Sequence, residues 1–116
     1  MREVVGCAFD ALSDPGCREF RIGEGDWPFK GFVVRQDRNI YAYQNFCAHV
    51  GHPLNWQPNR FLTEDGSHII CSSHGATYDI PQGRCTGGPC EGGSLRKVDV
   101  EIRDGDIVVT GPDSLR

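Results

Sequence analysis

Four residues able to bind a transition metal occur in two short motifs near the middle of the chain. Cys47 and His49 form a C-x-H motif, and Cys71 and His74 form a C-x-x-H motif. Each motif offers one thiolate and one imidazole, and these ligands suit zinc, copper and iron-sulfur centres far better than magnesium or calcium. The sequence therefore predicts a transition-metal centre that is held by two loops.

Two kinds of centre are compatible with two thiolates and two imidazoles. A structural zinc ion would take all four ligands, but zinc motifs usually pair cysteine with cysteine and histidine with histidine over short spacings. A two-iron cluster can instead be bound by two cysteines on one iron and two histidines on the other. Because each motif mixes the two ligand types, the spacing favours a cluster, and a single zinc ion is the alternative.

The residues around both motifs resemble those of the Rieske family. The segments are Cys47-Ala48-His49-Val50-Gly51-His52-Pro53-Leu54 and Cys71-Ser72-Ser73-His74-Gly75-Ala76-Thr77-Tyr78-Asp79, and a later run, Gly87-Gly88-Pro89, is similar to the third loop of that family. The resemblance covers roughly Phe32 to Thr110. It implies one Rieske-type 2Fe-2S cluster, with both cysteines on the inner iron and both histidines on the outer iron.

The resemblance extends to residues that would surround the cluster without ligating it. Gly51 and Gly75 follow the two histidines, Tyr78 lies further along the second motif, and Pro89 lies in the third loop. Glycine-rich loops of this kind are expected to bring backbone N–H groups close to the cluster sulfur atoms.

Two departures separate the chain from the cytochrome bc branch of that family. That branch has one more cysteine in each ligand loop, and the two form a disulfide, whereas His52 and Ser73 occupy the corresponding positions here. It also has a serine where this chain has Ala76. Hydrogen bonds to sulfur stabilise the reduced form. Their absence predicts a ferredoxin-like protein in the lower part of the Rieske range of about −150 to +300 mV.

The length and composition favour one loop-rich β domain. The chain has 116 residues, of which 15 are glycine and 7 are proline, and a chain of this size forms a single core. The resemblance implies an all-β fold, a Rieske-like antiparallel β-sandwich with a small cluster-binding subdomain that carries the two ligand loops. We expect one Rieske 2Fe-2S domain over residues 1–110 and a C-terminal tail over residues 111–116.

Several short segments alternate polar and apolar residues, as half-buried strands do. The pairs Asp65-Gly66 and Asp104-Gly105 favour hairpins, because glycine tolerates a positive φ. One predicted strand leads towards Cys47 and another runs directly into Cys71. The predicted strands cover residues 4–9, 18–22, 31–35, 40–44, 61–63, 68–70, 95–103 and 107–110.

The other four cysteines lie outside the two motifs. Cys7 and Cys17 are predicted to be small buried apolar residues, as free cysteines often are. Cys85 and Cys90 lie in the region of the third loop, where a local disulfide and a second ligand pair are alternatives. We expect both to be reduced thiols, because disulfides are rare in the cytosol.

Charge and hydropathy exclude some classes of partner. The net charge is −4, and phosphate binding needs a basic stripe that the sequence lacks, so no nucleic acid partner is expected. No apolar run is long enough for a signal peptide or a membrane anchor. We therefore expect a cytoplasmic monomer without membrane contact, whose acidic surface steers it to a basic patch on a redox partner.

A cluster that is fully ligated by protein and sulfide leaves no coordination position for a substrate, so it suits one-electron transfer. The resemblance implies a soluble Rieske-type ferredoxin that carries electrons from a ferredoxin reductase to a terminal oxygenase or another acceptor. Such a protein has no catalytic centre of its own. Two alternatives stay open. One is a small Rieske subunit of a multi-component oxidoreductase, of the dioxygenase or nitrite reductase type, and the other is a zinc-stabilised interaction module.

Overall fold

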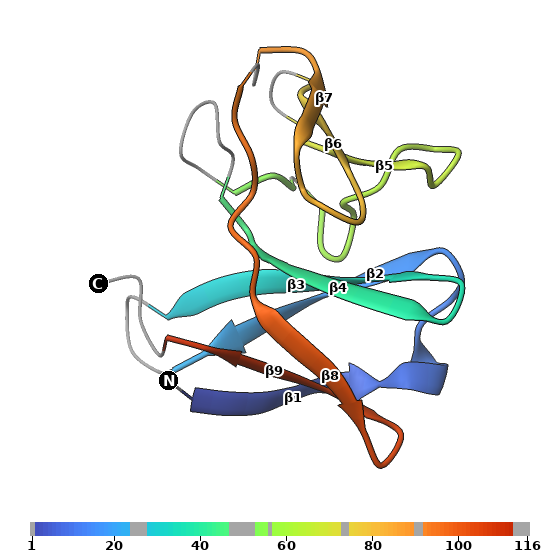
Figure 1. Ribbon diagram of the computed structural model, residues 1–116, viewed down its shortest axis with the longest axis vertical. Helices are drawn as coiled ribbons and strands as arrows, with labels where there is room; N and C mark the ends of the chain where they lie inside the picture. Colours follow the sequence, from blue (N-terminus) through green and yellow to red (C-terminus); the bar gives the residue numbers. More distant parts are fainter. Residues whose placement is uncertain are drawn as a thin grey trace.

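The computed structural model describes residues 2–23, 28–46, 53–55, 57–72, 75–89 and 92–112. Within these residues the chain forms nine strands and one short 3-10 turn, and the strands make three antiparallel sheets. The sheets lie one above another (Figure 1), which confirms the predicted all-β fold. Over the same ranges, no helix is long and apolar enough to cross a membrane.

The bottom sheet brings together the first and last strands of the chain. It consists of β1 (Arg2–Ala8), β8 (Asp99–Arg103) and β9 (Asp106–Gly111), in the order β1-β9-β8. The turn between β8 and β9 is formed by Asp104 and Gly105, whose φ angles of 53° and 82° are both positive. This is the hairpin that the Asp-Gly pair predicted.

The middle sheet is a three-stranded meander. It consists of β2 (Gly16–Ile22), β3 (Phe29–Gln36) and β4 (Asn39–Gln44), in that order. A two-residue turn, Asp37-Arg38, joins β3 to β4, and Asp37 has a φ of 58°. The Asp37 N–H donates to Asp14 Oδ1 at 2.8 Å, which ties this turn to the connection before β2.

The top sheet is the smallest and was predicted only in part. It consists of β5 (His68–Ile70), β6 (Thr77–Asp79) and β7 (Cys85–Gly87), in that order. Leu62 forms an isolated bridge to Ile69, so the predicted hairpin before β5 exists, although its first arm is not a full strand. β6 and β7 have three residues each, which is too few to show an alternating pattern in the sequence.

The middle sheet is covered on both faces because successive side chains of a strand point to opposite sides. On β3, Val33 belongs to the lower core, whereas Phe32 and Val34 belong to the upper core. The lower core lies between the bottom and middle sheets and contains Cys7, Leu12, Phe20, Ile22, Phe29, Val33, Ala42, Val98, Ile107 and Val109. The upper core lies between the middle and top sheets and contains Phe32, Val34, Tyr43, Leu54, Phe61, Ile69, Cys71, Ala76, Tyr78, Ile80 and Leu95.

The segment before β8 corrects one strand prediction. The predicted strand over residues 95–103 begins only at Asp99. Leu95 is buried in the upper core and Val98 in the lower core, so this segment passes from one layer of the molecule to the other. Residues 95–98 cannot form a strand that faces a single core, because they cross from one layer to the other. Their spacing of apolar residues nevertheless resembles the alternation of a strand.

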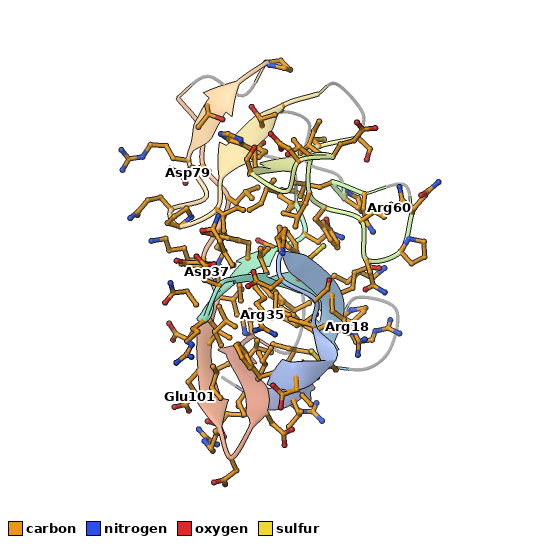
Figure 2. All side chains as sticks on the ribbon, turned by 90° about the vertical axis from the view of Figure 1, so that its right-hand side faces the viewer. Arg18, Arg35, Asp37, Arg60, Asp79 and Glu101 are labelled. Atoms are coloured by element: carbon orange, nitrogen blue, oxygen red, sulfur yellow. The ribbon has the colours of Figure 1, made fainter. Side chains whose placement is uncertain are left out.

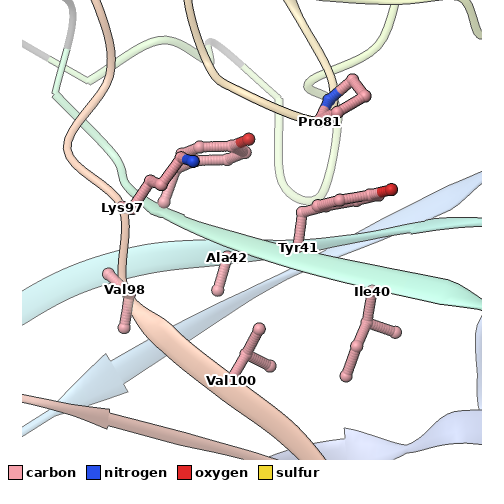
Figure 3. Close-up of a pocket in the computed structure, with 8 residues that line it drawn as sticks. Ile40, Tyr41, Ala42, Pro81, Lys97, Val98 and Val100 are labelled. Atoms are coloured by element: carbon pink, nitrogen blue, oxygen red, sulfur yellow. The ribbon is translucent and has the colours of Figure 1, made fainter.

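Residues that follow β6 contact the middle sheet beside this crossing segment. Pro81 lies above Tyr41 of β4, with Lys97 beside them (Figure 3). The Lys97 Nζ donates to Gln82 Oε1 at 3.1 Å. An open pocket of about 280 Å³ is lined by residues of β4 and by Pro81, Lys97, Val98 and Val100. The top sheet and the loops that join its strands are called the top unit below. The turn after β6 and the crossing segment thus hold the top unit to β4.

Candidate metal centre

The structure places one of the four predicted metal ligands. Cys71 is among the described residues, whereas Cys47, His49 and His74 lie outside them. In the described part of the chain, no three histidine, cysteine, aspartate or glutamate side chains could together hold a metal ion. The candidate centre is therefore built from Cys71 and from the described ends of the loops around it.

Cys71 lies directly after β5 and is fully buried in the upper core. Its N–H donates to Ala76 O at 2.8 Å, and its carbonyl accepts the Gly75 N–H at 3.0 Å. These two bonds close a tight loop between β5 and β6, in which Gly75 has a φ of 73°. Cys71 is not disulfide-bonded, so its sulfur is in the form that metal ligation requires.

The two ends of the first ligand loop lie beside the second ligand loop. Asn45, at the end of β4, accepts the Leu54 N–H on its Oδ1 at 2.8 Å. The Leu54 carbonyl in turn accepts the Ser72 N–H at 2.7 Å. Because Ser72 follows Cys71 directly, the residues on either side of 47–52 are bonded to the loop that carries Cys71.

The third loop packs on the second ligand loop. Gly88 has a φ of 79°, and a Cβ added there would lie 2.9 Å from Ala76 Cα and 3.1 Å from Gly75 O. The hydroxyls of Thr77 and Thr86 are hydrogen-bonded at 3.0 Å between β6 and β7. The run Gly87-Gly88-Pro89 therefore contacts the loop after Cys71, as expected for a third loop of the centre.

The residues predicted to surround the cluster are placed in part. Gly51 lies outside the described residues. Gly75 lies in the second ligand loop, Tyr78 is fully buried on β6, and Pro89 is exposed in the third loop. All three belong to the top unit together with Cys71. That they touch a bound cluster remains a prediction.

A buried tyrosine on β4 supports the top unit from below. The Tyr43 hydroxyl donates to Ile80 O, and a Cβ added at Gly83 would lie 2.6 Å from the Tyr43 ring. Burial raises the pKa of Tyr43 well above its ordinary value, so the hydroxyl remains a donor at any pH at which the protein is used. Sequence reasoning missed this residue, although its alternation with Ala42 on β4 placed it on the upper face.

The segment between the two ligand motifs is anchored on β2. The Asn59 N–H donates to Glu19 Oε2 at 2.9 Å, and the Glu19 N–H donates to Asn59 Oδ1 at 2.8 Å. The Cys17 thiol donates to Asn59 O at 3.0 Å, and burial raises the pKa of that thiol. Cys17 is half-buried and Cys7 is buried in the lower core, and neither is disulfide-bonded. The prediction of a small buried apolar residue thus holds for Cys7, whereas Cys17 is only half-buried and its thiol makes a hydrogen bond.

The turn that leads into β5 is organised by one carboxylate. Asp65 Oδ1 accepts hydrogen bonds from Thr63 Oγ1 at 2.6 Å, from Ser67 Oγ at 2.7 Å and from the Ser67 N–H at 3.1 Å. These donors, first the Thr63 hydroxyl, lower the pKa of Asp65 from 3.8 to about 2. The ionised carboxylate therefore holds the turn better than the protonated one.

We expect the Asp65→Asn protein to be less stable than the wild type near neutral pH, with a difference that disappears in acid. A carboxylate whose folded pKa is lowered contributes stability above its unfolded pKa and loses it as the pH falls through the folded pKa. For Asp65 this loss runs from about pH 4 down to about pH 2. Melting temperatures of both proteins between pH 7 and pH 2 measure the effect. A difference that does not change with pH would contradict it.

A second carboxylate caps the turn between β6 and β7. Asp79 Oδ1 accepts the Gln82 N–H at 2.9 Å and the Arg84 N–H at 3.2 Å. Figure 2 shows Asp79 in the top unit and Glu101 at the opposite end of the molecule. Asp79 therefore fixes the turn that aims the third loop at Cys71, and it does so far from the charged outer face of the bottom sheet.

The expectation of reduced thiols in the third-loop region is wrong for Cys85. Cys85 is disulfide-bonded, and its partner lies outside the described residues, as does Cys90. The expectation rested on the redox state of a compartment. Disulfide formation also depends on how closely the fold holds two thiols, and a sequence without coordinates does not give that distance.

The chemistry of the donor set fits a two-iron cluster. The described neighbours of Cys71 in the upper core include Leu54, Ala76 and Tyr78, all of which are fully buried. A thiolate in such an apolar environment needs a cationic partner, and two thiolates with two imidazoles are the donor set of a Rieske centre. The described ends of the first ligand loop and Gly88 of the third loop both contact residues close to Cys71 in the chain, which suits a group that is bound from several sides.

Solved structures of known proteins have the same fold. The ferredoxin of carbazole 1,9a-dioxygenase from Nocardioides aromaticivorans IC177 is 24% identical with a TM-score of 0.74, over 97% of this chain and 100% of that chain. A chain in the complex of reduced oxygenase and oxidized ferredoxin in carbazole 1,9a-dioxygenase is 24% identical with a TM-score of 0.72, over 98% and 97%. The terminal oxygenase of carbazole 1,9a-dioxygenase from Novosphingobium sp. KA1 is 16% identical with a TM-score of 0.71, over 97% of this chain and 30% of that one.

The family follows from the sequence as a whole. A search of curated protein sequences found no match to the chain. The family model of the Rieske [2Fe-2S] domain, however, matches residues 7–108, which include both ligand motifs and the third loop. The match confirms the resemblance and the 2Fe-2S cluster that it implied. The chain belongs to the Rieske [2Fe-2S] domain family.

Proposed function

We propose that the protein is a Rieske-type ferredoxin that carries single electrons from a ferredoxin reductase to a terminal oxygenase or another oxidoreductase. The observation that supports this most is that Cys71, the described ends of the first ligand loop and Gly88 of the third loop lie together beside the top sheet, which forms one end of the molecule (Figure 1). When bound, a Rieske cluster supplies one-electron exchange and leaves no position for a substrate. The middle and bottom sheets then serve as a rigid base.

The proposed ligands are Cys47 and Cys71 on the inner iron and His49 and His74 on the outer iron. Buried Cys71 would hold its iron inside the upper core, with its loop fixed by the bonds to Ala76 and Gly75. The histidines would then hold the iron that lies nearer to a docked partner. Support for this arrangement comes from the family, whose inner iron has cysteine ligands and whose outer iron has histidine ligands.

An exposed aromatic side chain beside the first ligand loop suits docking to a redox partner. Phe46 directly precedes Cys47 and is 47% exposed. Just before it, the Gln44 N–H donates to Arg96 O and the Asn45 N–H donates to Lys30 O. The side chains of Lys30 and Arg96 are both exposed. An apolar pocket with an acidic rim would complement these side chains. We infer that the partner surface that contacts Phe46 carries acidic side chains around an apolar pocket.

The similarity to an oxygenase over 30% of its length keeps one alternative open. A fold that forms part of an oxygenase chain can also serve as the small Rieske subunit of a multi-component oxidoreductase. Co-purification with a larger chain at a fixed ratio would favour that subunit over a freely diffusing carrier. A zinc-stabilised module would instead purify colourless, with zinc in the metal analysis.

We expect a redox titration of the purified protein to show a reversible one-electron transition. Two features place its midpoint in the lower part of the Rieske range of about −150 to +300 mV. The disulfide cysteines of the cytochrome bc branch are replaced by His52 and Ser73, and its serine by Ala76. The transition is followed by visible absorbance in the presence of mediators. A midpoint well above zero would contradict the ferredoxin-like assignment, and the absence of any transition would contradict the electron carrier.

A further inference from the structure

Asn45 is a buried polar residue at the entrance to the first ligand loop. It follows β4, lies two residues before Cys47 and is 7% exposed. Apart from tyrosine and cysteine, it is the only polar or charged side chain that is buried among the described residues. A buried amide must be hydrogen-bonded within the protein, because an unsatisfied donor or acceptor destabilises the fold. Its partners therefore show what it holds in place.

The Asn45 side chain joins the entrance of the first ligand loop to its exit. Its Oδ1 accepts the Leu54 N–H at 2.8 Å, and its Nδ2 donates to Asn55 Oδ1 at 2.9 Å. Its own N–H donates to Lys30 O at 2.9 Å, which fixes it to β3. The Asn45 amide thus links the residues before and after the first ligand loop to each other at the end of the middle sheet.

The same contact reaches the second ligand loop through a single peptide unit. The Leu54 N–H is held by Asn45, and the Leu54 carbonyl accepts the Ser72 N–H at 2.7 Å. Leu54 itself is fully buried, so neither bond can be replaced by water. Asn45, Leu54 and Ser72 therefore connect the residues that flank Cys47 to the residue that follows Cys71.

We propose that Asn45 is a positioning residue that fixes the two ligand loops relative to each other and so sets the geometry and the retention of the cluster. The inference rests on the proposed ligands Cys47 and Cys71. Only asparagine meets both demands of this position. Leucine offers neither an acceptor for the Leu54 N–H nor a donor for Asn55, and aspartate places two acceptors against the Asn55 oxygen.

The test compares Asn45→Leu with Asn39→Leu, which makes the same chemical change in the exposed turn at the far end of β4. Holoprotein is mixed with an excess of iron chelator, and the loss of visible absorbance gives the rate of cluster release. We expect Asn45→Leu to release its cluster at least ~10-fold faster than the wild type. Its reduced protein should also show shifted or broadened electron paramagnetic resonance g values. Asn39→Leu should match the wild type in both measurements.

A second variant separates the two hydrogen bonds of Asn45. Asn55→Leu removes the acceptor of the Asn45 amide, together with the exposed bond from Asn55 Nδ2 to Gln57 O, but leaves the bond to the Leu54 N–H. We expect Asn55→Leu to increase the rate of cluster release less than Asn45→Leu does. The double variant should release its cluster no faster than Asn45→Leu alone, because the two residues act through one contact. If Asn45→Leu does not fold, Asn55→Leu decides the question.

Wild-type release rates and g values in Asn45→Leu, or in Asn55→Leu where the first variant does not fold, would overturn the proposal. An additive double variant would overturn it as well. Failure of the proposed ligands looks different, because the wild-type protein itself would then purify without a 2Fe-2S cluster. The g values are included because a side chain that only supported the fold would change the melting temperature and leave the spectrum of the bound cluster unchanged.

Discussion

We expect the Cys71→Ala protein to purify without iron, sulfide or visible colour. Cys71 is the proposed ligand that the structure describes, and it is fully buried in an apolar core. Alanine cannot ligate iron, and in the described part of the chain no three histidine, cysteine, aspartate or glutamate side chains form a second metal site. Iron and acid-labile sulfide per chain, measured on anaerobically purified protein, give the result directly.

Two other cysteines provide matched controls for Cys71. Cys7 and Cys17 are likewise not disulfide-bonded, but Cys7 lies in the lower core and Cys17 lies on β2. Cys7→Ala and Cys17→Ala should both retain a full complement of iron. Cys17→Ala loses the hydrogen bond to Asn59 O and should be less stable by about 1 kcal/mol. Equal iron in all three variants, or equal loss in all three, would contradict the assignment of Cys71.

The Gly88→Ala substitution is expected to remove most of the cluster and to lower the free energy of unfolding. The added Cβ would lie 2.9 Å from Ala76 Cα and 3.1 Å from Gly75 O. Both atoms belong to the backbone of the second ligand loop, so that loop must move. The positive φ of 79° adds backbone strain of roughly 1–2 kcal/mol for any residue with a side chain. Cluster content and denaturant unfolding of the apoprotein measure the two effects.

Gly92→Ala separates the backbone strain from the displacement of the loop. Gly92 has a φ of 80°, but a Cβ added there would meet no atom of the described residues within 4 Å. The Gly92→Ala variant should therefore show the strain and keep its cluster. Gly88→Ala should be less stable than Gly92→Ala by roughly 1–3 kcal/mol, the usual effect of overpacking. Equal cluster content in the two variants would mean that the third loop does not support the second ligand loop.

The hairpins could be predicted because their turns are specified by neighbouring residues. Asp104 and Gly105 both have positive φ angles in the turn between β8 and β9. An Asp-Gly pair favours such a turn. The polar residues between the β3 and β4 segments likewise marked the turn at Asp37-Arg38.

Two strands of the top sheet, β6 and β7, could not be predicted because they depend on tertiary contacts. β6 and β7 each have three residues, and their pairing with β5 gives them their structure. The same limit explains the start of β8, where Leu95 and Val98 enter different cores. Local sequence cannot show that a chain crosses from one layer to the next.

The ligand motifs and their supports differ in how far the sequence reveals them. Cys71 could be predicted as a ligand because metal chemistry demands a thiolate at that spacing from an imidazole. Asn45, Tyr43 and Asn59 support the loops through partners that are distant in sequence, and residue types alone do not show those contacts. Polar residues at the buried end of a predicted strand, such as Asn45, are the signal that could have been used.

Electron paramagnetic resonance of anaerobically purified, dithionite-reduced protein tests the central claim most directly. The proposed ligation by two cysteines and two histidines predicts a spin-one-half signal whose average g value lies below that of 2Fe-2S ferredoxins with four cysteine ligands. Such a signal would establish imidazole ligation in this chain. The absence of a signal, together with zinc in the metal analysis, would contradict the electron carrier and leave Cys47, His49, Cys71 and His74 as a structural metal site.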